Sequence, residues 1–519
     1  MRSVRTVARA TAVVILMGAC QGSTPEPSPS PTPVSVSPTL TAAPSPSPSP
    51  KTPLGGTLRV AISTPIGSLD PRARDADPVV IGQVFEGLVM RGPNGPAPAL
   101  ATKWLVGPDG RAWTFTLRDG VVFHDGSALD GPAVAKSFSR ADDPIIERAE
   151  ATDPRTVVLT TRVPYGPFLS ALATAPYAVV SPSAKLAGTG AFRIPAGGEA
   201  ARPLALERND RYWRADATGQ KLPYLDRLSI TSIPDPGTRL ASIRAGNQDV
   251  ILDLAIGDIG AVRTDPSLQL VTRPETTVLY LGLNLSAAGV DDLRVRQAIA
   301  QTINARAIVD RLYGGAAAPA SQLPPPTMLG HDESVMEFAK NDPAAAKKLL
   351  IDSGHPALQL DLWYQLGGPV TLPEMRRVAE AIGADLGTAG VAADTKTIDA
   401  VTYDVSVREN RFPAWLGIAT AASFDPDDLL AAFIPPVVNG VDQPTEAGSW
   451  VNREVAGLLR KARSEPDRSK RLELYKQVSK IVQREIPRIP LVWSAPLAAA
   501  TKRVIDPKGL FFAEIALGK

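Results

Sequence analysis

The chain has 519 residues, which is too long for one compact hydrophobic core, so two or more lobes are expected. Hydrophobic residues make up 44% of the sequence and charged residues 21%, a composition that indicates a globular protein. The formal net charge is +2, and without residues 1–19, which carry three of the 55 basic groups, 52 basic groups face 53 acidic ones. This balance argues against a nucleic-acid binder. The single cysteine excludes an intramolecular disulfide and a cysteine-based zinc site.

The amino terminus has the pattern of an exported protein. Three arginines lie in residues 1–9, and residues 10–19 form an apolar run too short to span a bilayer, which predicts a secretory signal peptide. The run ends in Leu16–Cys20, which resembles a bacterial lipobox with Met17 where leucine, valine or isoleucine is more usual. Cleavage before Cys20 and attachment of a diacylglyceryl group would anchor the protein, because each buried methylene contributes about 0.8 kcal/mol. The alternative is a plain signal peptide followed by an incidental cysteine.

The segment from Gln21 to Pro53 consists mainly of proline, serine and threonine and has few apolar side chains. Such a segment cannot bury enough surface to offset its ordering entropy, and it favours extended polyproline II structure. We therefore expect a spacer between the membrane anchor and the folded part of the chain.

Regular structure is expected directly after this spacer. Apolar and polar or small residues alternate over Thr57–Ile62, which predicts a strand. A second strand is expected over Trp113–Leu117, whose large apolar side chains would share one face, and Asp125-Gly126 predicts a turn after it.

Helix start signals recur in the second half of the chain. Asp292 and Asn304 stand where they would cap two successive helices, each with one apolar face. Asp342-Pro343 opens another helix, which would end before Gly354. We also expect a strand over Leu358–Leu362, a helix from Pro373 to about Leu386, and an amphipathic helix over Asp467–Arg484. This alternation of strands and helices predicts an α/β lobe.

Several separated blocks of the sequence occur in an order typical of one protein family: Phe85–Leu88, Pro98–Ala101, Trp113–Arg118 and Phe123–Gly126. They resemble the blocks EGL, PaLA and WTFxLRxGvkFhDG of the family 5 extracellular solute-binding proteins, the dipeptide, oligopeptide and nickel receptors of ABC importers. The run Asp291–Asp310 resembles a second long block of that family, with Asn304 in place of the usual aspartate. Shorter matching blocks are Gly188–Phe192, Leu206–Trp213, Ala245–Val250 and Ile486–Trp493.

The resemblance covers about residues 54–519 and implies an α/β fold of the periplasmic-binding-protein type (type II), with two lobes and an extra subdomain in lobe one. A ligand would bind in the cleft between the lobes. The strand in Ile486–Trp493 is expected to return the chain to lobe one. The implied boundaries are a signal peptide over 1–19, a lipidated cysteine and linker over 20–53, lobe one over 54–84, 183–275 and 488–519, the extra subdomain over 85–182, and lobe two over 276–487.

The sequence gives little support for a catalytic or metal site. Its three histidines, His124, His331 and His355, lack the paired spacing of zinc ligands, and no Gly-x-Ser-x-Gly motif is present. Gly188-Thr189-Gly190 lacks the further glycine and the lysine of a phosphate-binding loop, so it predicts a tight turn. We therefore expect no enzymatic activity, no metal and no cofactor.

A group of three carboxylates, Asp425, Asp427 and Asp428, has two interpretations. In the order Asp-Pro-Asp-Asp before two leucines, it makes a capped helix start. It could also make a carboxylate site. The sequence leaves both open.

Aromatic residues are only 5% of the chain, so their positions carry information. Seven aromatic residues fall in segments that line the cleft in the receptors that the sequence resembles: Tyr177, Tyr280, Tyr364, Trp415, Phe424, Trp450 and Trp493. Each of them, taken alone, could instead belong to a hydrophobic core. Asp425 belongs to the same candidate site. Ala422 stands where peptide-binding members carry an aspartate that receives the amino terminus of the ligand. Without that charge pair, peptide specificity is in doubt.

The resemblance implies a monomeric, lipid-tethered receptor outside the cytoplasm. It would capture a small solute, a peptide or another polar metabolite, and deliver it to an ABC permease and its ATPase, with no nucleic-acid partner. One alternative is a surface module for sensing or adhesion without a transporter. An extracytoplasmic hydrolase on the same fold is a further alternative.

Overall fold

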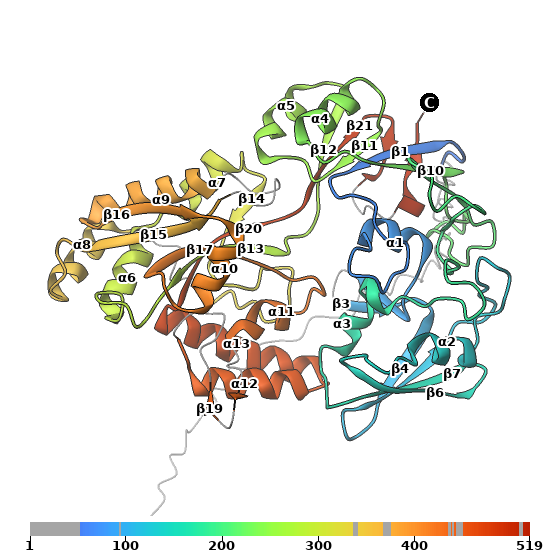
Figure 1. The fold of residues 1–519 in the computed structure, drawn as a ribbon, viewed down its shortest axis with the longest axis horizontal. Coiled ribbons are helices and arrows are strands. Elements are labelled where there is room, and N and C mark those ends of the chain that lie inside the picture. The colour runs from blue at the N-terminus through green and yellow to red at the C-terminus, as the bar shows by residue number, and fades with distance from the viewer. Residues whose placement is uncertain are drawn as a thin grey trace, which may run out of the picture. The chain divides into compact units, whose positions relative to one another are not determined.

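The computed structural model describes residues 52–92, 95–335, 341–366, 375–433, 437–438, 441–442, 450–507 and 512–518. The predictions about the signal peptide, Cys20 and most of the linker concern residues outside these ranges. No helix within the ranges is long and apolar enough to cross a membrane. The described part of the chain is organised around sheets of seven, six and four strands (Figure 1).

The seven-stranded first sheet has the order β12-β21-β11-β1-β10-β9-β8. The strand predicted over Thr57–Ile62 is confirmed as β1, which pairs in parallel with β10 and β11. Side chains alternate along a strand, so Val60 packs with α1 on one face while Ala61 packs with α4 and α5 on the other. The other bounds are β8 Phe192–Arg193, β9 Leu204–Arg208, β10 Arg227–Ser232, β11 Val250–Leu252, β12 Leu268–Thr272, β21 Leu497–Thr501, α1 Pro78–Val84, α4 Pro236–Arg244 and α5 Ile259–Thr264.

The six-stranded second sheet has the order β14-β20-β13-β17-β15-β16. Its strands are β13 Thr277–Leu283, β14 Ala317–Pro319, β15 Gln359–Gln365, β16 Ala392–Ile398, β17 Ala414–Thr420 and β20 Arg488–Ser494. The helices between and after these strands are α6 Leu293–Thr302, α7 Ala305–Leu312, α8 Pro343–Asp352, α9 Met375–Ala389, α10 Ala400–Arg408, α11 Asp427–Leu430, α12 Arg453–Ser464 and α13 Arg468–Glu485. The alternation of strands and helices predicted for this region is confirmed.

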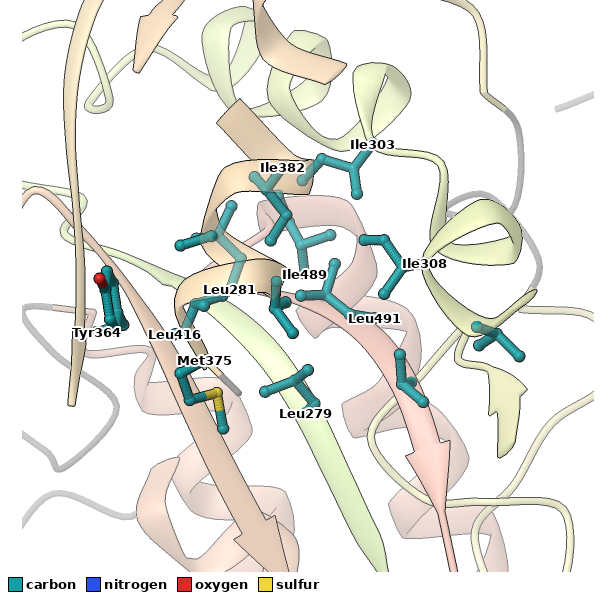
Figure 2. Packing of buried hydrophobic residues seen from close by; sticks show 14 of the residues in the cluster. Leu279, Leu281, Ile303, Ile308, Tyr364, Met375, Ile382, Leu416, Ile489 and Leu491 are labelled. Atoms are coloured by element: carbon teal, nitrogen blue, oxygen red, sulfur yellow. The ribbon is translucent and has the colours of Figure 1, made fainter. Parts of the chain in front are cut away.

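Both faces of the second sheet are covered. Leu279 and Leu281 of β13 pack in one hydrophobic core with residues of α6, α7 and α9 (Figure 2). Val278 and Tyr280 of the same strand point to the opposite face and pack in a second core with residues of α12 and α13. β13 is therefore apolar on both faces, as expected of a strand in the middle of a covered sheet.

The four-stranded third sheet has the order β4-β5-β7-β6 and, with α2 and α3, encloses its own hydrophobic core. The predicted face of Trp113, Phe115 and Leu117 is confirmed, since all three are buried in β5 while the residues between them are half-buried. The bounds are β4 Ala101–Val106, β5 Ala112–Leu117, β6 Ile146–Asp153, β7 Thr156–Thr161, α2 Gly131–Phe138 and α3 Phe168–Leu172. The remaining strands form three two-stranded antiparallel sheets: β2 Val89–Gly92 with β3 Gly95–Pro98, β18 Val437–Val438 with β19 Val441–Asp442, and β22 Val504–Ile505 with β23 Ala516–Leu517.

Two short segments connect the first and second sheets. One runs from Arg273 to Thr276 between β12 and β13, and the other is Ala495-Pro496 between β20 and β21. The segments are adjacent, because the backbone N–H of Thr276 donates to the carbonyl of Ser494 (3.3 Å). The expectation that the strand in Ile486–Trp493 returns to the first sheet is wrong. That strand is β20, which lies between β13 and β14, and its long run of apolar residues fits an interior strand of the second sheet.

The caps predicted at Asp292 and Asn304 are confirmed, and the helices predicted to begin at Asp342 and Asp467 are capped by these residues as well. The side chains of Asp292, Asn304, Asp342 and Asp467 accept hydrogen bonds from the first-turn N–H groups of α6, α7, α8 and α13. The helix predicted from Pro373 is α9, whose described part begins at Met375 and continues to Ala389, three residues beyond the expected end. Pro373 itself lies outside the described ranges.

Candidate functional site

The loop after β17 begins where the two sheets are joined. The backbone N–H of Ala421 donates to the carbonyl of Thr276 in the first connecting segment (2.8 Å). The next residue, Ala422, is exposed. The loop from Ala421 to Asp428 therefore lies beside the connection between the sheets, and several of the predicted site residues belong to it.

Side-chain hydrogen bonds hold this loop in one conformation. The backbone N–H and hydroxyl of Ser423 both donate to Oδ2 of Asp428 (2.7 and 2.9 Å). Asp425 Oδ1 accepts from the N–H of Asp427 (3.1 Å), which supports the helix-start interpretation of the three carboxylates. Phe424 has φ of 60°, a left-handed conformation that is unusual for a large side chain. Strained backbone of this kind often occurs at ligand sites.

Asp425 is a buried structural carboxylate. Its Oδ1 accepts from Arg471 Nη2 of α13 (2.5 Å) and from the Tyr475 hydroxyl (3.3 Å), and Oδ2 accepts from the Ser170 hydroxyl of α3 (3.4 Å). Burial lowers the pKa of Arg471, but the Asp425 charge and the Tyr475 oxygen raise it more, so the net shift is upward. Through these hydrogen bonds, Asp425 connects the loop to α13, which packs on the second sheet, and to α3, which packs on the third sheet.

The neighbouring Asp427 has a partner of its own. Its carboxylate accepts three hydrogen bonds from the Arg463 guanidinium of α12 (2.9 to 3.2 Å). Burial nevertheless raises the pKa of Asp427. The three carboxylates are thus bonded to different partners and do not converge on one point. Across the described ranges, no group of three or more His, Cys, Asp and Glu side chains is arranged to hold a metal ion.

The ring of Phe424 faces the hairpin β2–β3. The guanidinium of Arg91 in β2 lies over this ring, in the geometry of a cation–π contact. Arg91 is exposed, and Phe424 is half-buried. The contact joins the loop after β17 to the segment that links the first and third sheets.

The connecting segments leave the first sheet at the end where its parallel strands finish. The register aligns Thr272 with Leu497 and Leu252 with Ala498, so Arg273 and Asp253 follow at the same end of β12 and β11, the two strands on either side of β21. Ser63, directly after β1, donates to Asp253 Oδ2 (2.5 Å). In open α/β sheets, ligands bind outside the carboxyl ends of the strands.

A buried arginine stiffens the same end of the first sheet. Arg239 is 1% exposed and donates to the backbone carbonyls of Ile233, Pro234, Leu252 and Asp253 (2.6 to 3.0 Å). Burial lowers its pKa, and the charge of Asp253 acts in the opposite direction. The carbonyl groups that end β10 and β11 are therefore occupied by an internal donor.

Tyr280 and Trp415, two predicted site residues, lie on one face of the second sheet. Tyr280 is paired with Gly417 and Trp415 with Gly282, so each ring covers a glycine of the neighbouring strand. A side chain at either glycine would overlap the facing ring. Both aromatic residues line a cavity of about 300 Å³, together with Tyr403, Asp404 and Arg408 of α10.

The other four aromatic residues of the predicted set lie elsewhere. Tyr364 lies in the hydrophobic core shown in Figure 2, on one side of the second sheet. Tyr177 donates to Asp143 (3.5 Å) in the core of the third sheet. The Trp450 indole donates to Glu485 (2.8 Å), and that of Trp493 to the carbonyl of Gln322 (2.9 Å) beside a separate cavity of about 550 Å³.

The predicted residues therefore do not converge on one site. Ala422, Phe424 and Asp425 share a loop, Tyr280 and Trp415 share a cavity, and the rest pack in three different places. The predicted set lacks Arg91, which contacts Phe424 of the loop, and Arg273, which begins the first connecting segment. The position of Arg273 directly after β12, four residues before the strand that enters the second sheet, was the one available signal.

Comparison with known proteins identifies the family. The family model for bacterial extracellular solute-binding proteins, family 5 Middle, matches residues 95–439, which include strands of all three sheets. Heme-binding protein A of Haemophilus influenzae is 28% identical over 468 residues, covering 81% of this chain and 84% of that protein. The Dipeptide-binding protein of Escherichia coli is 28% identical over 460 residues, covering 79% and 84%.

The solved structure of HbpA2 from Haemophilus parasuis has the same fold. It superposes with a TM-score of 0.78 at 26% sequence identity, covering 89% of this chain and 100% of that chain. The predicted two-lobed α/β fold of the periplasmic-binding-protein type is thereby confirmed. Since the family model matches well over half of the sequence, this chain belongs to the bacterial extracellular solute-binding proteins, family 5.

Proposed function

We propose that the protein encloses a small solute between lobes built on its first and second sheets, with the third sheet as an extra subdomain of lobe one. Its family makes it the substrate-binding protein of an importer. The observation that carries the proposal is the pair of adjacent connecting segments, Arg273–Thr276 and Ala495-Pro496, which can act as a two-strand hinge. Hinge closure around a ligand removes water from it and gives the permease a distinct shape to recognise.

Within the predicted set, Ala422, Phe424, Tyr280 and Trp415 are the residues that we propose to contact or border the solute. Phe424 and Ala422 lie on the loop beside the hinge, and the other two line a cavity that is partly polar because of Asp404 and Arg408. The proposal leaves out Asp425, which is paired with Arg471, and Tyr364, Tyr177, Trp450 and Trp493, which do not line this cavity.

Relatives of the chain are named for haem and for dipeptides, so the family accommodates different solutes. A peptide or another polar metabolite is therefore the proposed class. At Ala422 no carboxylate is available to pair with a free amino terminus. This supports a solute whose recognition does not depend on an α-amine.

We also propose that the signal peptide is removed, that Cys20 carries a lipid and that the monomeric protein works beside an ABC permease and its ATPase. The support is the position of the only cysteine, directly after the apolar run. Expression of the Cys20→Ala variant checks the anchor. The wild-type chain should sediment with membranes and the variant should be released, whereas equal release of both proteins would contradict lipidation.

The capture itself is tested with the purified full chain in mild detergent. The protein is incubated with a filtered cell extract, freed of unbound solute, and denatured, and the released molecules are identified by mass spectrometry. We expect a stoichiometric solute, a smaller radius of gyration by X-ray scattering when it is added back, and loss of its uptake when the gene is deleted. Absence of any released solute together with an unchanged radius of gyration would refute solute capture.

A further inference from the structure

Two arginines near the proposed hinge form no salt bridge with any residue that the structure describes. In the described part of the chain, neither Arg91 nor Arg273 makes a side-chain hydrogen bond or an ion pair, and the Arg91 guanidinium lies over the Phe424 ring. Arg91 is exposed and Arg273 is half-buried. Both guanidinium groups thus keep free N–H donors that a ligand could reach.

The two arginines are close enough to repel each other. Burial lowers the pKa of Arg91 to about 10, and the positive charge of Arg273 contributes to the same shift. Burial also lowers the pKa of Arg273, with Asp253 as the charge that acts against it. Two like charges in a partly buried position are unfavourable unless an anion joins them.

The carboxylate that acts on Arg273 is engaged by other groups as well. Asp253 already accepts the hydroxyl of Ser63 (2.5 Å), and its charge acts on Arg239 as well as on Arg273. The carboxylate of Asp253 is therefore shared between the guanidinium groups of Arg239 and Arg273.

The two arginines come from the segments that border the proposed binding region. Arg273 is the first residue of the connecting segment after β12, at the end of the sheet where β1 and β11 finish. Arg91 belongs to β2 and contacts the loop that carries Phe424. An anion placed between the two arginines would lie beside both the hinge and that loop.

We infer that the solute is an anion, and that Arg91 and Arg273 together hold its carboxylate or a similar oxyanion. The inference rests on the proposed function and specifies its substrate class. A guanidinium offers a planar fork of donors that matches the two oxygens of a carboxylate. The Phe424 ring fixes the plane of Arg91 before the ligand arrives, which reduces the entropy lost on binding. Phosphate has the same donor requirement, so the test includes both oxyanions.

The test compares the full chain with Arg273→Gln, Arg91→Gln and the control Arg148→Gln. Arg148 lies in β6 of the third sheet, is 64% exposed and pairs with Glu150. Each protein is incubated with the same filtered extract, and the captured solutes are identified and their charge is measured by electrophoresis. Calorimetric titration then compares the affinity for a carboxylate with the affinity for its amide in three matched pairs: glutarate with glutaramide, nicotinate with nicotinamide, and a tripeptide with its carboxyl-terminal amide. Inorganic phosphate is titrated separately.

The wild-type chain and Arg148→Gln should capture an anionic solute. Each of the other variants should bind that solute about 10-fold or more weakly, as expected for loss of a charge-assisted hydrogen bond. In the matched pairs, at least one carboxylate should bind better than its amide. Binding of phosphate alone would identify the oxyanion as phosphate and equally support the inference. Because both arginines are unpaired without ligand, Arg273→Gln should also melt at the same or a higher temperature than the wild type.

Three results would overturn the inference. The first is that the captured solutes are neutral or cationic. The second is that the carboxylates bind no better than their amides and that phosphate does not bind. The third is that Arg91→Gln and Arg273→Gln both bind the captured solute with the affinity of the wild type. In the first and third cases solute capture itself would stand, so the two proposals fail separately. If no protein captured any solute, the proposed function would fail and this inference with it.

Discussion

Arg471 and Asp425 form an ion pair of 2.5 Å whose side chains are only 5% and 4% exposed. The pair is embedded among further polar partners, because Arg471 also donates to the carbonyl of Gly166 (3.1 Å) in the loop before α3. It therefore links α13, the loop after β17 and the segment next to the third sheet. A charge at this depth is stable only while its partner is present.

Replacing Asp425 by alanine should destabilise the protein by about 3–5 kcal/mol, because the buried guanidinium would lose its counter-charge. The double variant Asp425→Ala/Arg471→Met should be less destabilised than the sum of the single variants. Urea denaturation followed by tryptophan fluorescence measures both. Asp352→Ala, which removes the partner of exposed Lys348, is the control and should change stability by less than about 1 kcal/mol. Equal effects of the two aspartate variants would contradict the structural role of the buried pair.

Gly417→Ala should destabilise the second sheet, since a methyl group there would overlap the Tyr280 ring. The ring would have to leave its position over the strand, at a cost of about 1–3 kcal/mol by analogy with overpacked cores. Gly457→Ala provides a matched control in α12, where a new methyl group meets no atom within 4 Å. This control should stabilise the protein by about 0.5–1 kcal/mol. Thermal melts of both variants test the contrast, and a stabilising Gly417→Ala would show that Tyr280 is not seated on the glycine.

Glu86 should make the stability depend on pH. Its carboxylate accepts hydrogen bonds from Thr189, Tyr212 and Trp213 (2.8 to 3.0 Å), yet burial raises its pKa above the ordinary value of 4.5. The folded state therefore binds the proton more tightly than the unfolded state does. As a result, the contribution of Glu86 to stability should increase as the pH falls through its folded pKa and level off below about 4.5.

Glu86→Gln is the variant that isolates this effect, because it keeps the shape and removes the titration. The free energy of unfolding of the wild type minus that of the variant should rise as the pH is lowered from 8 toward 4.5. Chemical denaturation at a series of pH values measures the difference. A difference that is constant, or that rises with pH, would show that Glu86 does not carry the raised pKa.

Phe424 allows the backbone and the ring to be tested apart. With φ of 60°, glycine should fit the backbone better than alanine, so Phe424→Gly should be about 1 kcal/mol more stable than Phe424→Ala. Both variants lose the ring under Arg91 and should bind the captured solute equally weakly. Thermal melts and calorimetric titration of the two variants give these comparisons. If affinity followed stability instead, the loop conformation rather than the ring would be the determinant.

Local patterns were sufficient for the elements. The caps at Asp292, Asn304, Asp342 and Asp467 depend on a short side chain next to its own helix, so the sequence shows them directly. The strand with Trp113 was equally clear, because one of its faces is buried and the other is half-buried. The order of the sequence blocks indicated the family and hence the fold.

Local patterns failed where the partner is distant in sequence. The strand of Ile489 and Val492 is apolar on both faces, which fits either sheet, and only its pairing with β13 and β14 assigns it to the second one. The aromatic residues gave no indication of whether they pack in a core or border a cavity, since burial of an aromatic side chain serves both.

The sequence by itself determined most of the elements and the family, because these depend on neighbouring residues and on the order of motifs. Only the tertiary structure decided that Asp425 is paired with Arg471 and that Arg91 and Arg273, which form no ion pair with any described residue, act on each other electrostatically. The physical reason is that electrostatic pairing depends on distance in space. Arg91 and Arg273 are far apart along the chain, so no local pattern could bring their charges together.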